Sequence, residues 1–504
     1  MEESRTKKSV KNIIFNLSNQ VIGIILNFVS RTIFIHTLGV EYLGLNGIFS
    51  DVLSMLSMAD LGFNTAMVYS FYKPIAENNQ RKISALINFY SKVYNIIALI
   101  ITILGILIIP FLPLIINLEK DIPLLNVYYL FSLANVVISY LFVYKTSIIT
   151  ADQKNYIVTK INIIITTVRT ILQIITLLLF KNYIIYLLLG IIGNLLSNYI
   201  ASKKAEKLYP YIKNKEDISK EEKMDIFNNL KSVFLYKASS VLLNATDNTI
   251  ISVLLGTVIV GYYSNYLMIN NKIVSIFSLV FTSLTASIGN IIVTESTKKR
   301  FEIFKCEQSI SFIICTIVIP CFFNLINDLI LIWLGKDFIF DLKVIFAISL
   351  NMYLSCVLQP LWSYREATGL YRKTKWIMLI CAIVNIILSI LMGKLIGLMG
   401  ILLASAISRI CTYVWIEPKI LFKEYFEESP NNYFYSLAKN LLIIGVFSIS
   451  LNLIFKNWIV SSWIGFILKS IVLIIISIII SCVIYAKNPS LSIIKNKIVK
   501  YKRI

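Results

Sequence analysis

Long apolar runs separated by short polar breaks dominate the pattern of this chain. Each run covers about 20 to 30 residues, which is the length that an α-helix needs to cross roughly 30 Å of hydrocarbon. Strands of a membrane barrel would instead be about ten residues long and would alternate between apolar and polar positions. We count fourteen such runs in the 504 residues. The pattern therefore predicts an all-α polytopic membrane protein with about 14 transmembrane helices.

The pattern also repeats once along the chain. The stretches NFVSRTIFIHTLG (residues 27–39) and NATDNTIISVLLG (residues 244–256) share Asn, Thr, Ile, Leu and Gly at one offset of 217 residues, 244 minus 27. The match continues at Gly44 and Gly261. Six predicted spans in each copy make the copies parallel, and duplicated transporters place their substrate between the halves near the middle of the membrane. We therefore predict two six-helix repeat halves around a central cavity.

A charged stretch, KNKEDISKEEKMD, separates the two copies. Its mixed charges are typical of a solvated connector or a short surface helix. The chain is then expected to comprise an N-terminal six-helix lobe at 1–202, a cytoplasmic connector at 203–230, a C-terminal six-helix lobe at 231–425, two extra transmembrane helices at 426–486 and a basic cytoplasmic tail at 487–504.

Composition and charge agree with a membrane protein. A hydrophobic content of 57% with only 15% charged residues is too apolar for a soluble protein of this length. The net charge of +21 would suggest nucleic acid in a soluble protein, but only six of the 48 Lys and Arg fall in loops assigned to the outside. This bias follows the positive-inside rule. We expect a multi-pass protein of the cytoplasmic membrane with both termini in the cytoplasm and no nucleic-acid partner.

Polar residues inside the predicted spans recur three or four positions apart, so they share one face of each helix. Such stripes occur on the first, fifth, seventh and eighth spans, with Asn16, Gln20, Asn27 and Arg31, then Asn162, Arg169 and Gln173, then Lys237, Asn244 and Asp247, and finally Asn265 and Lys272. A charge facing lipid costs about 3 kcal/mol on insertion scales. We therefore expect the stripes to line a wet cavity.

Four basic residues lie deep in predicted spans without an acidic residue within four positions on the same helix, namely Arg31, Arg169, Lys272 and Arg409. A positive field of this kind suits an anionic substrate, and the planar guanidinium can bind two phosphate oxygens at once. We expect these four to bind substrate together with the amides of Asn27, Asn244 and Gln173. The alternative is that Arg31 pairs with Asp51 or Asp247 and only fixes helix packing.

Asp51 and Asp247 also lie within predicted spans, and we expect them to form the coupling site for H⁺ or Na⁺. No metal-binding cluster and no GxxxxGK[ST] phosphate loop can be assembled from the sequence, so we expect no metal, no cofactor and no ATP-driven step. The short external loops leave no room for a catalytic domain. The chain is therefore not expected to be an enzyme.

The stretch MADLGFNTAMVYSFYKPIAENNQRKI (residues 58–83) and the LGxxxxG turn at Gly39 and Gly44 resemble the oligosaccharide flippases, Wzx type, of the multidrug/oligosaccharidyl-lipid/polysaccharide exporter superfamily. The resemblance covers the length, the duplicated halves and the two extra helices. It implies ion-coupled alternating access that moves an undecaprenyl-pyrophosphate-linked oligosaccharide repeat unit from the inner to the outer leaflet for capsular or O-antigen synthesis.

The resemblance implies partners as well: the lipid-linked oligosaccharide, membrane lipids, the coupling ion, and contacts with a polysaccharide polymerase and glycosyltransferases. It also suggests that the two extra helices offer a groove for the polyprenyl tail. Two other functions remain open, a multidrug or small-molecule exporter of the same superfamily and a membrane-embedded polysaccharide polymerase. Carboxylates would dominate the cavity of a drug exporter, and a polymerase would need a catalytic constellation.

Overall fold

The computed structural model describes residues 5–60, 63–118, 122–486 and 488, and within them it contains helices and turns but no β-strand. The prediction of an all-α fold is confirmed. The chain divides into two compact units, Met1–Tyr262 and Tyr263–Ile504, and the division falls inside α12 (Thr257–Thr282). The predicted lobes at 1–202 and 231–425 rest on the repeat in the sequence. The division into two compact units does not test them.

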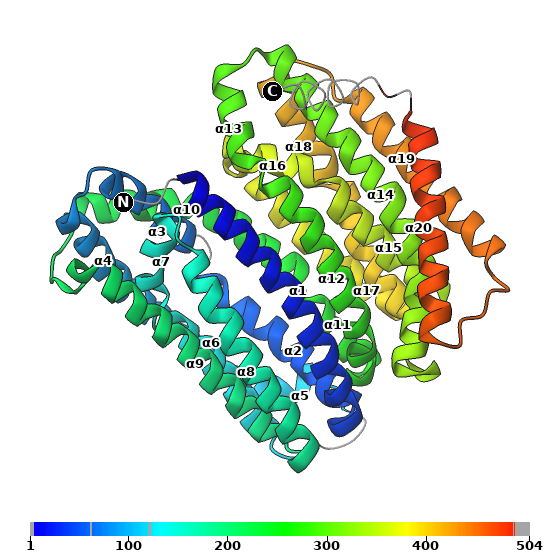
Figure 1. The fold of residues 1–504 in the computed structure, drawn as a ribbon, viewed down its shortest axis with the longest axis horizontal. Helices are drawn as coiled ribbons and strands as arrows, with labels where there is room; N and C mark the ends of the chain where they lie inside the picture. The colour runs from blue at the N-terminus through cyan, green and yellow to red at the C-terminus, as the bar shows by residue number, and fades with distance from the viewer. Residues whose placement is uncertain (1–4, 61–62, 119–121, 487, 489–504) are drawn as a thin grey trace. The chain divides into compact units, whose positions relative to one another are not determined.

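Antiparallel helices joined by short turns build the first unit (Figure 1). Its helices are α1 (Arg5–Leu38), α2 (Val40–Leu56), α3 (Phe63–Ala76), α4 (Gln80–Ile108), α5 (Leu112–Ile115), α6 (Leu125–Tyr140), α7 (Val143–Ala151), α8 (Tyr156–Phe180), α9 (Tyr183–Leu208), α10 (Lys220–Asn244) and α11 (Asp247–Leu255). Helix α8 packs against α1 and α9, and α9 also packs against α6. An aromatic cluster ties these helices together, with the ring of Tyr183 4.8 Å from that of Tyr128 and 5.8 Å from that of Phe34.

The second unit is arranged around one long helix, α14, which packs against several others. Its helices after α12 are α13 (Thr285–Thr294), α14 (Thr297–Leu334), α15 (Leu342–Val357), α16 (Gln359–Thr368), α17 (Tyr371–Cys411), α18 (Tyr413–Leu421), α19 (Asn431–Ile454) and α20 (Trp463–Tyr485). Helix α14 contacts α15, α19 and α20. Lys469 of α20 donates to Asp328 Oδ2 of α14 at 2.8 Å, which gives this buried lysine a partner within the apolar bundle.

The described residues contain 10 helices long and apolar enough to cross a membrane, or up to 12 if each of two bent helix pairs is one span. The prediction of fourteen spans is therefore not confirmed. Two places account for the difference between fourteen and twelve. The sequence predicts one span at 44–71, which is divided between α2 and α3, and two spans at 374–394 and 397–417, which lie in one continuous stretch, Lys373–Phe426.

Within α17 the chain turns back on itself at Ile396 and Gly397. Gly397 has φ +63°, and a Cβ atom on Gly400 would lie 2.1 Å from the carbonyl oxygen of Met392. In an unbroken helix, residues eight positions apart would be separated by about 12 Å. The contact therefore requires a tight reversal, and α17 contains two helical arms.

The glycines of the repeat mark a close crossing of α2 with the start of α12. A Cβ atom on Gly44 would lie 2.2 Å from the Thr257 carbonyl oxygen, and one on Gly261 would lie 2.4 Å from the Val40 carbonyl oxygen. The two contacts are related by the repeat offset, since 44 plus 217 is 261 and 40 plus 217 is 257. Each copy thus supplies a glycine that lets the other copy's backbone approach.

The stretch predicted as a connector, 203–230, contains the end of α9 and the beginning of α10. Helix α10 begins at Lys220, and Ser219 and Glu222 form a reciprocal capping box at its start. Arg81 Nε pairs with Glu216 at 3.0 Å, and Lys92 pairs with Asp217 at 3.3 Å. These ion pairs attach the connector to the beginning of α4.

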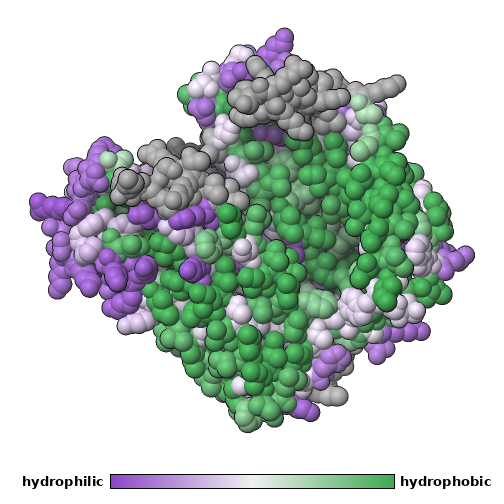
Figure 2. Space-filling view, viewed as in Figure 1, coloured by the Kyte–Doolittle hydropathy of each residue, from purple (hydrophilic) through white to green (hydrophobic). Residues whose placement is uncertain are grey.

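Apolar side chains cover the visible flanks of the helices, and polar side chains gather at their ends (Figure 2). Many large hydrophobic residues are exposed, among them Leu179 of α8 at 69% and Val483 of α20 at 71%. Water would oppose such exposure, whereas lipid accepts it. The surface is therefore that of a multi-pass membrane protein.

Candidate functional site

The polar stripe of α8 faces the neighbouring helix α9 in the first unit. Gln173 is buried and its Nε2 donates to the Tyr186 carbonyl oxygen of α9 at 2.9 Å. One turn away, Arg169 lies across Gly193, where a Cβ atom would be 2.5 Å from the arginine Cδ. The glycine therefore leaves room for the arginine side chain to cross α9.

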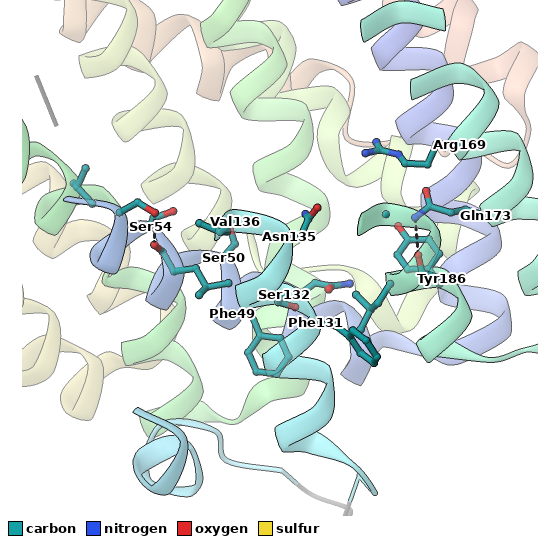
Figure 3. Close-up of a pocket in the computed structure, with 16 residues that line it drawn as sticks. Phe49, Ser50, Ser54, Phe131, Ser132, Asn135, Val136, Arg169, Gln173 and Tyr186 are labelled. Atoms are coloured by element: carbon teal, nitrogen blue, oxygen red, sulfur yellow. Dashed lines mark hydrogen bonds between the residues drawn. The ribbon is translucent and has the colours of Figure 1, made fainter. Parts of the chain in front are cut away.

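Beside Arg169 and Gln173 the first unit has an open cavity of about 570 Å³ (Figure 3). Side chains of α2, α6, α8, α9 and α10 form its wall, and most of its polar groups are hydroxyls and amides. The polar lining residues are Asn46, Ser50, Ser54, Ser57, Ser132, Asn135, Arg169, Gln173 and Tyr186. The arginine is the one charged residue among the described residues that line this cavity.

The two arginines predicted in the first unit approach the same tyrosine. Electrostatic interactions join the guanidinium groups of Arg31 and Arg169 to Tyr186, and Ser30 forms a side-chain hydrogen bond with it. Arg31 is half-buried on α1 and does not line the cavity. Tyr186 does line the cavity, so it connects the positive field of both arginines to this space.

The predicted ion-coupling residues lie together at the beginning of α11. The Asn248 backbone N–H donates to Asp51 Oδ2 at 3.1 Å, and the carboxyl groups of Asp51 and Asp247 interact electrostatically. Asp51 therefore places a carboxylate at the positive end of α11. Neither aspartate lines the cavity of Arg169.

Comparison with protein families gives this arrangement its context. Residues 9–288, more than half of the chain, match the family of polysaccharide biosynthesis proteins. The chain belongs to this family.

Solved structures show that this polysaccharide biosynthesis protein has the fold of MOP superfamily transporters. It resembles the lipid II flippase MurJ in an inward closed conformation, with 17% identity over 94% of this chain and 98% of that chain and a TM-score of 0.65. It also resembles an inward-facing multidrug resistance transporter of the MATE family, with 15% identity over 80% and 96% of the chains and a TM-score of 0.59. A MOP superfamily transporter from Pyrococcus furiosus is similar at 13% identity over 84% and 97% of the chains, with a TM-score of 0.55. Among curated proteins, none matches.

The other two basic residues predicted to bind substrate belong to the second unit of this polysaccharide biosynthesis protein. Lys272 is half-buried on α12. Arg409 of α17 is buried, and its Nη1 donates to Ser355 Oγ of α15 at 3.1 Å. The structure therefore gives Arg409 a contact between helices.

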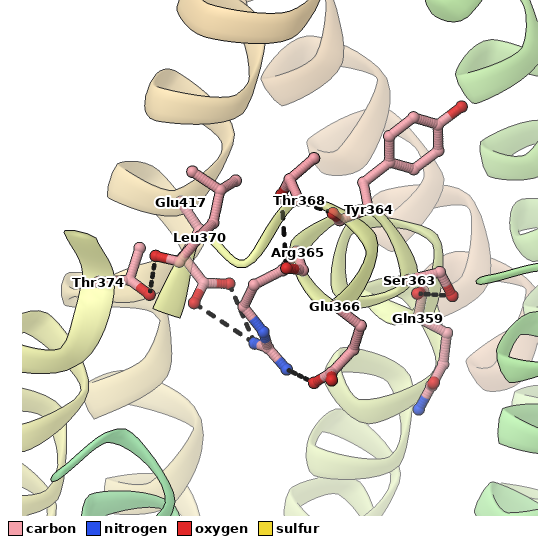
Figure 4. A network of polar contacts seen from close by, with 9 residues as sticks. All are labelled: Gln359, Ser363, Tyr364, Arg365, Glu366, Thr368, Leu370, Thr374 and Glu417. Carbon is pink, nitrogen blue, oxygen red and sulfur yellow. Dashed lines mark hydrogen bonds and ion pairs between the residues drawn. The ribbon is translucent and has the colours of Figure 1, made fainter. Parts of the chain in front are cut away.

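The second unit also contains a buried ion pair between Arg365 and Glu417 (Figure 4). Arg365 of α16 places Nη1 3.4 Å from Glu417 of α18 and Nη2 3.6 Å from Glu366. Arg365, Glu417 and Arg409 all interact electrostatically with Tyr413. The positive charge in this region thus has carboxylate neighbours.

The two predicted asparagines do not line the cavity. Asn27 and Asn244 are exposed, and Asn244 Nδ2 donates to the Ser240 carbonyl oxygen of its own helix at 2.6 Å. Of the predicted substrate residues, Arg169 and Gln173 therefore line the cavity and Arg31 lies beside it, through Tyr186.

Sequence reasoning missed the partners of α8 in this cavity. Tyr186 and Asn135 were not predicted as site residues, and Ser50 was not recognised on α2. One signal was present on α9, where Tyr183, Tyr186, Gly190 and Gly193 follow at spacings of three, four and three. Such a face of small and hydroxyl-bearing residues could have been matched to the stripe of α8.

Proposed function

We propose that this protein moves an undecaprenyl-pyrophosphate-linked oligosaccharide repeat unit from the inner to the outer leaflet of the cytoplasmic membrane for capsular or other surface polysaccharide synthesis. The observation that carries the proposal is the cavity of Arg169, which offers one cation and many neutral hydrogen-bonding groups inside an apolar bundle. It is a transporter and not an enzyme, and its partners include the polymerase and glycosyltransferases of the same synthesis.

Arg169 and Arg31 supply fixed positive charge for the pyrophosphate. A diphosphate without partners cannot enter hydrocarbon at reasonable cost, and a guanidinium replaces lost water with two parallel hydrogen bonds. Arg169 forms no ion pair among the described residues, so its guanidinium is free to bind a phosphate oxygen pair. Lys272 is the basic residue of the second unit that we assign to the substrate, whereas Arg409 is bonded to Ser355 and is assigned to packing.

Sugar hydroxyls are matched by the neutral part of the same wall. Ser50, Ser132 and Asn135 can both donate and accept hydrogen bonds, as a polyol requires. Gln173 holds the α8 and α9 faces together through its bond to Tyr186. Asn27 and Asn244, which are exposed, contribute to substrate binding only in another state of the cycle.

The polyprenyl tail requires an apolar groove. The second unit has one of about 340 Å³, lined by apolar and cysteine side chains of α12, α14 and α20, including Ile273, Phe322 and Phe466. Helix α20 is one of the two extra helices that the resemblance associates with the tail. We assign the tail to this groove.

Coupling to H⁺ or Na⁺ is assigned to Asp51 and Asp247. Two interacting carboxyl groups in a membrane protein are poorly tolerated as a doubly charged pair, so one proton or one sodium ion between them lowers the cost. Binding of that ion would change the field at the beginning of α11. Alternating access then follows from the different ion occupancy of the two states.

The test is transport by purified protein in liposomes. A membrane-impermeant glycosidase cleaves labelled glycan only after the glycan has crossed to the leaflet that the enzyme can reach, so cleavage measures transport. The pyrophosphate-linked oligosaccharide should be moved under a proton or sodium gradient, and the same glycan on a phosphate-free polyprenyl carrier should not. A cationic amphiphile, the typical substrate of a drug exporter, is assayed as the substrate of the alternative function. Gradient-driven movement of the cation without movement of the lipid-linked glycan would overturn the proposal.

A further inference from the structure

A further cavity lies in the second unit, and none of its lining residues is assigned to the proposed transport site. It has a volume of about 450 Å³ and is formed where α14 and α19 begin and α20 ends, beside the π-helical turn Phe422–Phe426. The charge distribution of the sequence predicts that these helix ends face the cytoplasm. The proposed transport function assigns nothing to this cavity.

Three of its lining residues carry buried polar atoms that have no hydrogen-bond partner among the described residues. They are Gln308 Oε1, Tyr433 Oη and Asn440 Oδ1, on side chains that are only 5%, 6% and 2% exposed. More than nine in ten buried polar groups in proteins are hydrogen-bonded, and an orphaned group costs about 1–3 kcal/mol. Three such atoms on residues that line one cavity would suit a ligand that both donates and accepts hydrogen bonds.

The ring of Tyr433 is held firmly, so the position of its hydroxyl is fixed. Its centroid lies 5.9 Å from that of Phe304 and 5.6 Å from that of Phe422. Asn440 is likewise fixed, because its Nδ2 donates to Tyr485 Oη at 2.6 Å. The unsatisfied atoms therefore belong to preorganised side chains.

Two lysines give the cavity a positive charge. Lys305 and Lys439 both line it, and the Lys305 ammonium lies 4.5 Å from the centroid of the Phe301 ring. Among the described lining residues none is acidic, and neither lysine forms an ion pair with another described residue. An anionic ligand would therefore meet two ammonium groups, each of which can donate to phosphate oxygens.

The mouth of the cavity adjoins lipid-facing surface. Ile484 of α20 lines it and is 38% exposed, while Leu442 of α19 and Val483 of α20 nearby in the sequence are 69% and 71% exposed. A headgroup in the cavity could therefore keep its acyl chains against these helices. Anionic lipids are also concentrated at the cytoplasmic face of many membranes.

We propose that this cavity binds the headgroup of an anionic phospholipid with a hydroxylated phosphodiester, such as phosphatidylglycerol. The phosphate accepts hydrogen bonds from Lys305, Lys439 and Tyr433, and the headgroup hydroxyls donate to Gln308 and Asn440. The lipid is a bound component of the second unit and is not the transported substrate.

The experiment is native mass spectrometry of the full protein released from nanodiscs that contain equal amounts of phosphatidylglycerol and phosphatidylcholine. The parent protein should retain phosphatidylglycerol preferentially. The double variant Lys305→Gln/Lys439→Gln should weaken its retention about tenfold and Tyr433→Phe about threefold, because the first removes two charged donors and the second removes one neutral donor. Arg169→Ala should leave retention unchanged, which separates this proposal from the proposed transport function.

Lys423→Gln is the matched control, because Lys423 is an exposed lysine of the same helical end that does not line the cavity. An equal loss in Lys423→Gln would show that general surface charge attracts the lipid and would overturn the proposal. Equal retention of both lipids by the parent would overturn it too, and so would displacement of the lipid by inorganic phosphate alone. If Tyr433→Phe proves unstable, the exposed lysine variants still decide the result.

Discussion

Arg169 of the first unit and Arg409 of the second unit have similar sequence contexts, since both lie inside apolar segments with no acidic residue within four positions. Their surroundings differ in the fold. Arg169 is half-buried, crosses Gly193 and lines a cavity of about 570 Å³. Arg409 is only 8% exposed and bonds to Ser355, in a region where Arg365 and Glu417 form an ion pair.

The difference teaches that a buried arginine in a membrane protein is not by itself a binding residue. A guanidinium that is packed between helices stabilises their contact, as Arg409 does through its bond to Ser355. A guanidinium on the wall of a cavity can exchange water for substrate. The two roles predict different results. Loss of a guanidinium packed between helices should lower stability, whereas loss of a guanidinium on the wall of a cavity should lower transport.

The largest effect is expected at Glu417. Glu417→Ala leaves Arg365 buried beside its more exposed neighbour Glu366, and removal of one partner from a buried ion pair costs about 3–5 kcal/mol. Thermal unfolding followed by size-exclusion chromatography in detergent should show a marked loss of folded protein. The double variant Arg365→Met/Glu417→Leu should recover much of that loss. A stable Glu417→Ala protein would show that the pair does not hold α16 and α18 together.

Arg409→Met should reduce stability by about 1–2 kcal/mol, because it removes the hydrogen bond that the buried guanidinium donates to half-buried Ser355. The protein that remains folded should bind substrate nearly as well as the parent. The measurement is the apparent melting temperature together with substrate affinity. A large loss of affinity with no change in melting temperature would place Arg409 with Arg169.

Arg169→Ala should reduce transport of the lipid-linked oligosaccharide at least about tenfold, the effect of losing one good charged hydrogen bond. Its stability should change by less than about 1 kcal/mol, because the side chain borders a cavity. Arg169→Lys keeps the charge but loses the planar fork, so partial transport is expected. Normal transport by Arg169→Ala in liposomes would remove this cavity from the substrate route.

Gly193→Ala offers a gentler test of the same contact. The added Cβ would lie 2.5 Å from Arg169 Cδ, so the arginine must shift while its charge remains. We expect transport to fall a few-fold, with substrate affinity affected more than folding. Gly289→Ala is the control, since a Cβ at that helical position meets nothing within 4 Å. Equal effects of the two substitutions would argue against a positioning role for Gly193.

The smallest change in stability is expected for Asp51→Asn. The amide oxygen can still accept from the Asn248 backbone N–H, whereas the negative charge is lost. Folding should therefore change by less than about 1 kcal/mol, while the dependence of transport on a proton or sodium gradient should disappear. Transport by the variant is to be compared with and without each gradient. An unchanged gradient dependence would leave Asp51 as a helix cap only.

One pH effect lies outside the membrane spans, in the connector. Hydrogen bonding and charge attraction from Lys82 lower the pKa of the Glu222 carboxyl below its ordinary value. A lowered pKa in the folded state adds stability that is present above the ordinary glutamate pKa and is lost as the pH falls through the folded value. This contribution should be small, because Glu222 is partly exposed.

The sequence by itself determined the fold class and the membrane setting. Runs of apolar residues leave helices as the only way to satisfy the backbone in lipid, so composition and run length suffice for that inference. The 217-residue offset likewise located Gly44 and Gly261 before their contacts with Thr257 and Val40 were visible. Helical spacing placed Arg169 and Gln173 on one face, because that relation depends only on the helix itself.

Only the tertiary structure decided which partner each polar residue meets. The spacing on α8 and the face of α9 offered a possible match, but only the fold shows that Arg169 meets Gly193 and Tyr186. No pattern on α17 could reveal that Arg409 meets Ser355. Asp51 and Asn248 are 197 positions apart, yet they form one hydrogen bond. The physical reason is that burial and pairing depend on distances between helices, whereas a sequence states only the order of residues along each one.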